Sequence, residues 1–398
     1  SEIFPLGKRA KYIGLITSMF ALASIMGPGL GGVITDKLSW RWVFFVNIPL
    51  CAAAFFLIAK YFPVIIHQDN AKRRLDIPGT AAFVFAAFPL LLAISRLGSE
   101  SITSIDMISL FLFSGIMIAI FLFLELRSKE PLLSLHFFRD RIFSVSVIAS
   151  SLGNMAIFGA AIYFPLYLQS LRGQSATRSG LIMMPMMVSM IIASNISGVL
   201  VARLHRFKII AAVGLILAAA GTFCFGYFGE GAAISTLMMF STAAGFGLGL
   251  TFPIFAVAPQ SVFHPRQIGI VTSLLQFFRN LGGSIGSAVF GAIMLSHMHK
   301  AMKGVPHGSL SDQTASLIQN PGVIANPAKV SAIRGSIPDS SLGDFNRFVS
   351  SCLHSMSGSI EMIFIVSSAI LLFAFATLVY YFNERHVAQA VAEHKKQY

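Results

Sequence analysis

The sequence predicts an all-α polytopic membrane protein, and three observations support this fold class. Of the 398 residues, 55% are hydrophobic and only 11% are charged, whereas soluble domains carry about 25% charged residues. Apolar segments of about 20 residues, the length of helix that crosses a bilayer core, recur along the chain. Few ionisable residues interrupt these segments. Because backbone exposed to lipid must form its own hydrogen bonds, each segment is expected to be a helix.

Ten segments are candidate membrane spans. They lie near residues 13–35, 43–60, 78–95, 105–125, 143–168, 179–202, 208–228, 232–258, 267–295 and 360–382. Between the last two lies the only long polar stretch, 297–357, which is rich in Ser, Gly, Pro and Asn. We expect this stretch to be a loop outside the membrane, and its composition suits a flexible one.

The basic residues predict the orientation of the spans. Ten spans place both chain ends on one side, and most Lys and Arg residues of the short loops fall there, as in 71–74, 127–141 and 203–208. Because positively charged short loops stay in the cytoplasm, both termini are predicted to be cytoplasmic, in a multi-pass protein of the cell (inner) membrane. The formal net charge of +13 is therefore attributed to topology. Nucleic-acid binding is disfavoured because the basic residues form no single patch.

The stretch SIMGPGLGGVITD (24–36) determines how the first span is interpreted. Gly27, Gly29 and Gly32 match the G-x-G-x-x-G pattern of a dinucleotide-binding turn, which requires a strand before it. The preceding run is of helix length instead, so we interpret the stretch as part of a membrane helix. Pro28 has no N–H and kinks a helix, and Gly27 and Gly31 share a face that a neighbouring backbone can approach closely. Gly27, Pro28, Gly31 and Gly32 are therefore the predicted packing residues of this helix.

A second copy of this helix occurs later in the chain. With a shift of 255 positions and no gaps, residues 14–34 align with 269–289, and Gly27 and Gly31 fall on Gly282 and Gly286. Both segments run from the cytoplasm outward in the predicted topology. Parallel repeats related by an axis along the membrane normal are typical of one large class of transporters. The repeat therefore predicts a carrier with two related lobes.

Several motifs resemble one transporter family. GPGLGG followed by LSWRWVFFVNIPL resembles the fifth and sixth helices of the 14-helix drug:proton antiporters of the major facilitator superfamily. The stretches EPLLSLHFFRDRIF (130–143), FPLYLQSLRGQSATRSGLIMMP (164–185) and FRNLGGSIGSAVFGAIM (278–294) resemble later parts of the same subfamily. The opening residues resemble the loop before its fifth helix. The resemblance therefore implies a major facilitator fold that is truncated at its N-terminus and lacks the first four helices.

The resemblance also implies a domain organisation and a function. Residues 1–62 would be the remainder of an N-terminal bundle, 63–141 two linker helices with cytoplasmic loops, 142–383 a C-terminal six-helix bundle, and 384–398 a cytoplasmic tail. The implied activity is proton-coupled efflux of hydrophobic or cationic drug-like compounds, with the proton gradient as energy source and no cofactor. Two alternatives stay open: export of a specific metabolite such as a siderophore or fatty acid, and an inactive truncated remnant. The implied partners are the lipid bilayer, a small-molecule substrate and a periplasmic adaptor protein at 297–357.

Arg279 is the most informative candidate binding residue. It lies near the middle of its span, where a charged side chain is costly and by default faces a cavity. A structural arginine bonded to helix-end carbonyls is the alternative. Further candidates for a substrate cavity are Asn154, Tyr163, Tyr167, Gln169 and Gln276. Each of these is also compatible with helix packing or with an interfacial aromatic belt.

The loop around residues 198–208 resembles a degenerate copy of the superfamily's cytoplasmic gate motif. Arg203 and Arg206 fit that motif, whereas Ala202 and His205 stand where Asp and Gly are typical. The alternative role of the two arginines is positive-inside anchoring.

The sequence does not predict an enzyme or a metal site. The histidines fall in loops or at span ends, and no Ser-His-acid or paired-carboxylate arrangement is visible. The HMH stretch (297–299) has no accompanying acidic or Cys cluster.

Overall fold

The computed structural model describes residues 19, 23, 26–61, 76–97, 103–128, 133, 135–204, 206–229, 231–264, 267–303, 305–306, 308–382 and 384. Within these residues every regular element is a helix, and nine helices are long and apolar enough to cross a membrane. They correspond to nine of the ten expected spans. Of the remaining expected span, 13–35, the structure describes residues 19, 23 and 26–35, and the stretch from residue 26 is helical. The all-helical membrane fold is thus confirmed.

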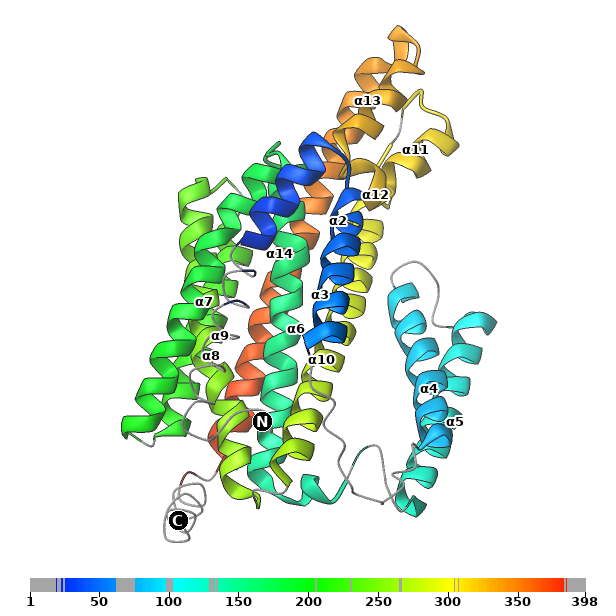
Figure 1. Cartoon of the computed structure of the whole chain (residues 1–398). Helices are drawn as coiled ribbons and strands as arrows, with labels where there is room; N and C mark the ends of the chain where they lie inside the picture. The colour runs from blue at the N-terminus through cyan, green and yellow to red at the C-terminus, as the bar shows by residue number, and fades with distance from the viewer. Residues whose placement is uncertain are drawn as a thin grey trace.

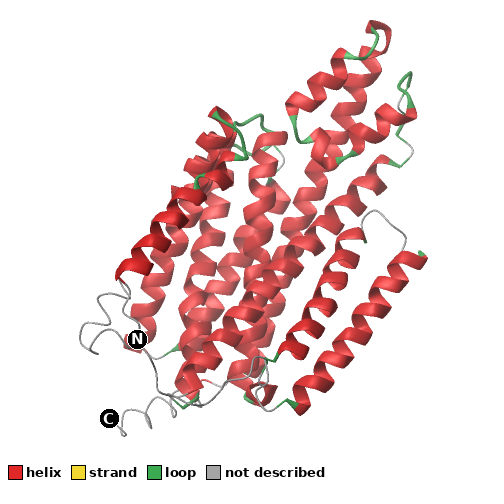
Figure 2. Cartoon of the chain, turned by 45° about the vertical axis from the view of Figure 1, so that its right-hand side comes forward, coloured by secondary structure: helices red, strands yellow, loops and turns green. Residues whose placement is uncertain are grey.

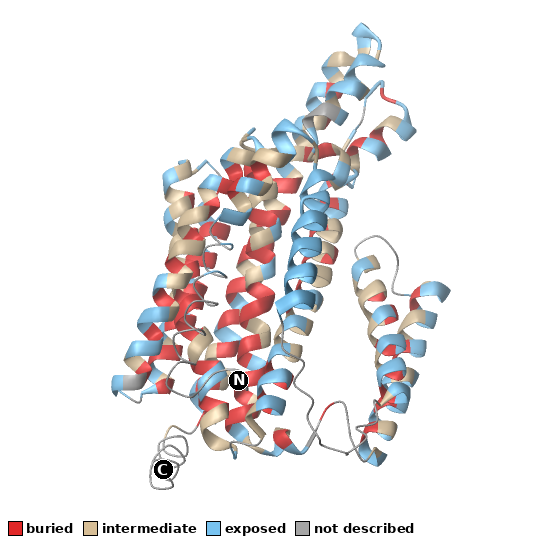
Figure 3. Ribbon diagram, viewed as in Figure 1, coloured by how far each residue is buried: buried red, intermediate tan, exposed pale blue. Residues whose placement is uncertain are grey.

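The N-terminal elements are a helix over 26–37 followed by α2 (Trp42–Phe45) and α3 (Asn47–Tyr61). The helix over 26–37 lies against the upper part of the bundle in the view of Figure 1, and α3 runs along the side of the bundle. No residue of α3 is buried in the structure (Figure 3). Since α3 is almost wholly apolar, these exposed side chains suit contact with lipid or with other membrane helices.

A separate helical hairpin stands at one side of the bundle (Figures 1 and 2). It consists of α4 (Ile77–Arg96) and α5 (Ile105–Arg127), which begin at the capping side chains of Asp76 and Ser104. The Phe83 ring joins the hairpin to the bundle, because it lies 5.6 Å from the ring of Phe121 in α5 and 5.2 Å from that of Phe277 in α10. The short helix η1 (Leu135–Arg139) then leads into the bundle.

Six long helices form the main bundle. They are α6 (Arg141–Ser170), α7 (Ala176–Leu204), α8 (Phe207–Phe228), α9 (Ile234–Val262), α10 (Ile268–Met302) and α14 (Leu342–Tyr381). Buried residues are concentrated in α6, α8, α9 and α14 (Figure 3). Helix α9 packs closely on α8 because a glycine of α9 meets a glycine of α8. A Cβ atom on Gly247 would lie 2.5 Å from the backbone oxygen of Gly214.

The polar stretch 297–357 differs from the expected flexible loop. The structure continues α10 to Met302 and begins α14 at Leu342, and between them lie α11 (Asp312–Gln319), α12 (Pro321–Ile324), α13 (Pro327–Gly335) and η3 (Asp339–Ser341). With 40 residues, α14 is about 60 Å long, so it extends well beyond a bilayer core of about 30 Å. The polar residues mark helix starts, since Ser311 and Asn320 accept hydrogen bonds at the N-termini of α11 and α12.

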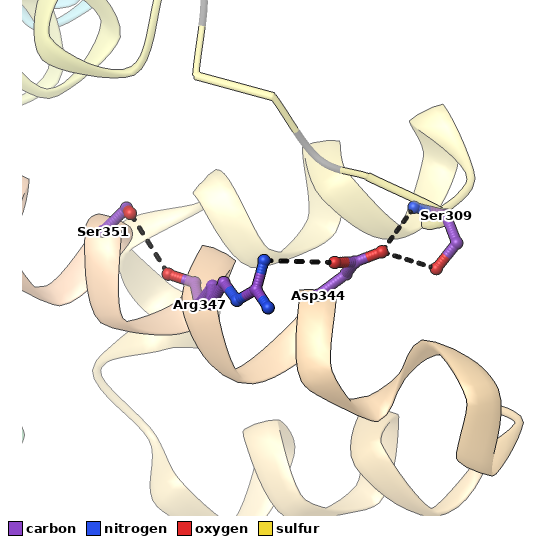
Figure 4. Close-up of polar contacts among 4 residues, drawn as sticks. All are labelled: Ser309, Asp344, Arg347 and Ser351. Carbon is purple, nitrogen blue, oxygen red and sulfur yellow. Dashed lines mark hydrogen bonds and ion pairs between the residues drawn. The ribbon is translucent and has the colours of Figure 1, made fainter.

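The elements from α11 to η3 (residues 312–341) are called the outer helical segment below. This segment is anchored to α14 by a small polar cluster (Figure 4). Asp344 Oδ2 accepts hydrogen bonds of 2.9 Å from both the backbone N–H and the hydroxyl of Ser309, and Arg347 Nη1 lies 4.0 Å from Asp344 Oδ1. The turn before Ser309 requires glycine because Gly308 has a φ of +60°. Phe345, Phe348 and Cys352 are buried beneath it, and they belong to an apolar cluster that continues into the main bundle.

Candidate functional site

A cavity of about 60 Å³ lies between α6, α9 and α10. Its polar lining residues are Ser150 on α6, Gln260 on α9, and Thr272, Gln276 and Arg279 on α10. Phe252, Phe255, Ala256 and Leu275 form its apolar walls. Because most of the bundle interior is apolar, a cavity with five polar lining residues is a candidate site for ligand recognition.

Arg279 supplies the positive charge of this cavity. Its guanidinium carbon lies 4.5 Å from the centre of the Phe252 ring, a distance suited to a cation–π interaction. The Nε atom is buried and forms no hydrogen bond with any residue that the structure describes. Because a buried donor without a hydrogen bond is costly, the half-buried Arg279 side chain is suited to bind an anion.

Asn154 holds the backbone of Arg279 in place against α6. The Asn154 side chain is buried, and its Nδ2 donates a 2.8 Å hydrogen bond to the backbone oxygen of Arg279. One helical turn closer to the start of α6, the hydroxyl of Ser151 donates a 2.9 Å hydrogen bond to the backbone oxygen of Phe278. These two bonds join α6 to α10 beside the cavity.

The candidate binding residues from the sequence thus occupy different places. Gln276 and Arg279 line the same cavity, and Asn154 supports the backbone of Arg279. Tyr163 is buried farther along α6, edge-on to Phe290 with ring centres 6.4 Å apart. The other two predicted residues, Tyr167 and Gln169, lie farther still along α6 and do not line the cavity.

Tyr167 forms part of the packed interior near the end of α6. Its side chain is 2% exposed, and its hydroxyl donates a 2.7 Å hydrogen bond to the backbone oxygen of Gly229. Arg172 lies over its ring and donates to the same oxygen. Gln169 is half-buried in the last turn of the helix. Tyr167 therefore connects α6 to the α8–α9 turn.

Sequence reasoning missed several residues of the cavity, namely Ser150, Phe252, Gln260 and Thr272. One signal was present: Thr272, Gln276 and Arg279 are spaced four and three residues apart, which places them on one helix face. The structure adds a hydrogen bond of 3.0 Å from the Gln260 amide to the Thr272 hydroxyl. The contribution of α9 depends on tertiary packing and has no comparable signal.

The helix over 26–37 contacts α7 at the opposite end of the bundle from the α7–α8 turn. Gly29 and Gly32 are buried in this contact. A Cβ atom on Gly32 would lie 2.5 Å from the backbone oxygen of Ala176, and one on Gly180 would lie 2.6 Å from the carbonyl carbon of Pro28. The two helices therefore meet backbone to backbone through glycines on both sides.

Asp36 completes this contact by capping α7. Its carboxylate accepts hydrogen bonds from the first two N–H groups of α7, 3.1 Å from Ala176 N and 2.8 Å from Thr177 N. These N–H groups have no acceptor within their own helix, and the positive end of the helix dipole favours the negative charge. Hydrogen bonds from the side chain and backbone of Thr177 lower the pKa of Asp36 below its usual value.

Among the predicted packing glycines of this helix, Gly32 lies in the contact with α7, and Gly27 and Gly31 do not. A Cβ atom added to Gly27 or Gly31 would have no described atom within 4 Å, whereas one added to Gly29 or Gly32 would. The reason is rotational: α7 lies on the side of the helix that carries residues 29 and 32. The repeat counterparts Gly282 and Gly286 face α6, where their Cβ atoms would lie 2.5 Å from Ser151 O and from Met155 Cγ.

The predicted gate loop is exposed in the structure. Arg203 lies in the last turn of α7 and Arg206 directly precedes α8. Neither forms an ion pair with an acidic side chain in the described part of the chain. The side chain of Ala202 and the whole of His205 lie outside the described residues.

The chain is similar in sequence to one described family and to several known proteins. The family described as Major Facilitator Superfamily matches residues 1–287. The chain is 28% identical over 383 residues to Multidrug resistance protein 3 of Bacillus subtilis (strain 168), which covers 95% of the chain and 72% of that protein. It is 34% identical over 294 residues to Multidrug transporter protein MdtP of the same organism, covering 74% of the chain and 54% of that protein.

Two further similarities concern a fungal protein and a solved structure. The Aspyridones efflux protein of Neocamarosporium betae is 31% identical over 293 residues, covering 71% of the chain and 52% of that protein. The chain thus spans about half the length of this relative and of MdtP. A crystal structure of a bacterial homologue of the human lysosomal transporter Spinster, inward-facing and occupied, matches with a TM-score of 0.53 at 13% identity, covering 94% of the chain and 71% of that structure.

Proposed function

The chain belongs to the major facilitator superfamily, and on that premise we propose that it exports hydrophobic or cationic drug-like compounds by proton-coupled alternating access. The observation that carries the proposal is the contact between the helix over 26–37 and α7. That contact joins two lobes through glycine backbones and one exposed carboxylate, so it can form and separate without unpacking large side chains. The relatives named multidrug or efflux proteins support the substrate class.

The domain division and the orientation are parts of the same proposal. Residues 1–62 belong to an N-terminal lobe, 63–141 contain the linker hairpin, 142–383 form the C-terminal bundle, and 384–398 are a cytoplasmic tail. The ends of α5 and α7 carry Arg127 and Arg203, and the positive-inside rule assigns that side to the cytoplasm. The outer helical segment between α10 and α14 then faces outward, where an adaptor protein would contact it.

The internal repeat supports a second contact between the lobes. The shift of 255 positions aligns Gly29 and Gly32 with Ser284 and Ser287 on α10. Ser284 is exposed and Ser287 half-buried, and both are small. By the same geometry that joins residues 29 and 32 to α7, this face of α10 meets the N-terminal lobe. Small residues permit close approach of helices in one state of the transport cycle.

Transport by inside-out membrane vesicles tests the proposal. The probes are ethidium as a cation, 1-pyrenebutanol as a neutral compound and 1-pyrenebutyrate as an anion. We expect at least one probe to accumulate when a pH gradient is imposed, and accumulation to cease when an ionophore collapses the gradient. Equal accumulation with and without the pH gradient would contradict proton coupling. Absence of accumulation of every probe, with the chain present in the membrane, contradicts export of drug-like compounds and favours the inactive remnant.

Export of one specific metabolite is the second candidate function. The observation that favours it is the similarity to a relative named for the efflux of aspyridones. Such a protein would transport one compound class and ignore the chemically diverse members of the probe panel. Transport of both ethidium and 1-pyrenebutanol would contradict this candidate.

A further inference from the structure

The charge distribution of the C-terminal bundle is one-sided. Helices α6, α7, α8, α9 and α10 contain no Asp or Glu. On α14 the apolar part contains Glu361, whose Oε1 accepts a hydrogen bond from Ser357, and α14 contributes no lining residue to the cavity. Arg279 is therefore a positive charge in a cavity without a carboxylate of its own.

Some hydrogen-bonding side chains around the cavity have partners among the described residues, and others do not. The Gln260 amide donates to Thr272, whose hydroxyl in turn donates to the backbone oxygen of Ile268. Ser150 donates to the backbone oxygen of Val147. Arg279 and Gln276, by contrast, have side chains without a hydrogen bond to any described residue. The free groups are thus a guanidinium and an amide, and the guanidinium is purely a donor.

We propose that Arg279 and Gln276 form a carboxylate-binding subsite, and that the compounds exported by this protein include amphiphiles that carry a carboxylate. The inference rests on the proposed transport function and adds anionic amphiphiles to the hydrophobic and cationic compounds proposed there. A guanidinium binds a carboxylate through two parallel N–H···O bonds, and the Gln276 amide supplies a further donor. One guanidinium neutralises one negative charge, which matches a carboxylate better than a phosphate with its charge near −2.

The size and walls of the cavity specify the rest of the ligand. Drug-sized pockets have volumes of about 300–1,000 Å³, whereas this cavity measures about 60 Å³. It therefore holds the head of a larger molecule. The rings of Phe252 and Phe255 and the side chain of Leu275 suit the alkyl or aryl group next to the carboxylate. Gln276 and Thr272 are exposed, so the body of the ligand leaves the cavity along this face of α10.

Binding to the purified full chain tests the subsite with three matched probes. 1-Pyrenebutyrate, 1-pyrenebutanol and 1-pyrenebutylamine share one apolar body and differ only in the charge of the head group. We expect the butyrate to bind at least tenfold more tightly than the amine. Arg279→Gln should weaken butyrate binding at least tenfold and change butanol binding less than twofold. Arg279→Lys, which keeps the charge but loses the two-bond geometry, should give an intermediate loss for the butyrate.

Two further variants keep the experiment decisive. Arg334→Gln removes an arginine of the outer helical segment and should leave the affinities for all three probes unchanged. Gln276→Met changes an exposed residue and is expected to fold, so it tests the subsite even if Arg279→Gln does not fold. It should weaken butyrate binding severalfold and spare the butanol. Thermal unfolding of each variant separates loss of binding from loss of structure.

Three outcomes would overturn the subsite. One is equal binding of the butyrate and the butanol by the unaltered chain. Another is an equal loss of both probes in Arg279→Gln, which would make Arg279 structural. The third is an unchanged butyrate affinity in Arg279→Gln, which would show that Arg279 does not bind the carboxylate.

The subsite and the proposed function can fail separately. If the butyrate binds as expected but no probe is transported, the proposed function fails while the subsite stands. If probes are transported at rates that depend neither on their charge nor on Arg279, the subsite fails while the proposed function stands.

Discussion

Adding one methyl group at Gly180 should separate the helix over 26–37 from α7 at their glycine contact. In Gly180→Ala the new Cβ would lie 2.6 Å from the carbonyl carbon of Pro28, whereas real Cβ contacts are not shorter than 3.0 Å. The backbones must therefore move apart by at least about 0.4 Å, the difference between these two distances. Overpacking of this kind costs about 1–3 kcal/mol. Because only the packed arrangement bears this cost, its population relative to the separated arrangement should fall about 5- to 150-fold.

The matched control lies on the same helix. In Gly198→Ala the Cβ of an α7 residue meets no described atom within 4 Å, so no separation is expected. The alanine should instead favour the helix by up to about 1 kcal/mol. Gly32→Ala provides an independent test from the other side of the contact, since its Cβ would meet the backbone of Ala176 and Thr177.

Distances between spin labels can measure this effect. Labels at the exposed positions Lys37 and Arg178 report the separation of the two helices, after the three native cysteines are replaced by alanine. Gly180→Ala and Gly32→Ala should shift the distance distribution towards longer values, and Gly198→Ala should not. An unchanged distribution in Gly180→Ala, or an equal shift in Gly198→Ala, would refute the reasoning.

Three further predictions concern polar contacts at the same end of the molecule. Tyr167→Phe removes the buried hydrogen bond to Gly229 and should lower the free energy of unfolding by about 1 kcal/mol in detergent while transport continues; unchanged stability would contradict it. The pKa of Asp36 is lowered in the folded protein. The stabilisation from its cap on α7 is therefore fully present above the ordinary carboxyl pKa, and it is lost only as the pH falls through the lower pKa of the folded state. The label distance should therefore stay constant from pH 7 to pH 5, and Asp36→Asn should lengthen it at every pH; a transition near pH 6 would argue against the cap. Asp344→Ala frees Ser309 and should speed proteolysis of the outer helical segment, and an unchanged cleavage rate would exclude an anchoring role.

The membrane fold was predictable because its cause lies in the composition of each segment. The segment 208–228 illustrates this, since the structure places α8 at Phe207–Phe228. A run of apolar residues of bilayer length has no alternative to a helix in lipid, whatever its neighbours are. The start of α14 was not predictable in the same way. Its first residues are polar, and they become helical because Phe345 and Phe348 pack beneath the outer helical segment.

The candidate site was predictable only in part. An arginine in mid-span is anomalous in any sequence, and Arg279 does line the cavity. The aromatic candidates on α6 carry no such signal, because a tyrosine suits a cavity wall, an interface or the interior equally well. Tyr167 is buried against Phe225 of α8, and this contact depends on how α8 lies against α6.

By itself the sequence determined that this chain crosses the membrane repeatedly as helices, that glycine-rich segments recur in register, and that one arginine lies at mid-span. These are local properties, since hydropathy, spacing and charge belong to each segment alone. Only the tertiary structure decided which glycines touch, because a rotation of one helix about its axis exchanges Gly27 and Gly31 for Gly29 and Gly32. It likewise decided that residues of α6, α9 and α10 enclose Arg279 together, since the packing of helices distant in sequence sets their shared cavity.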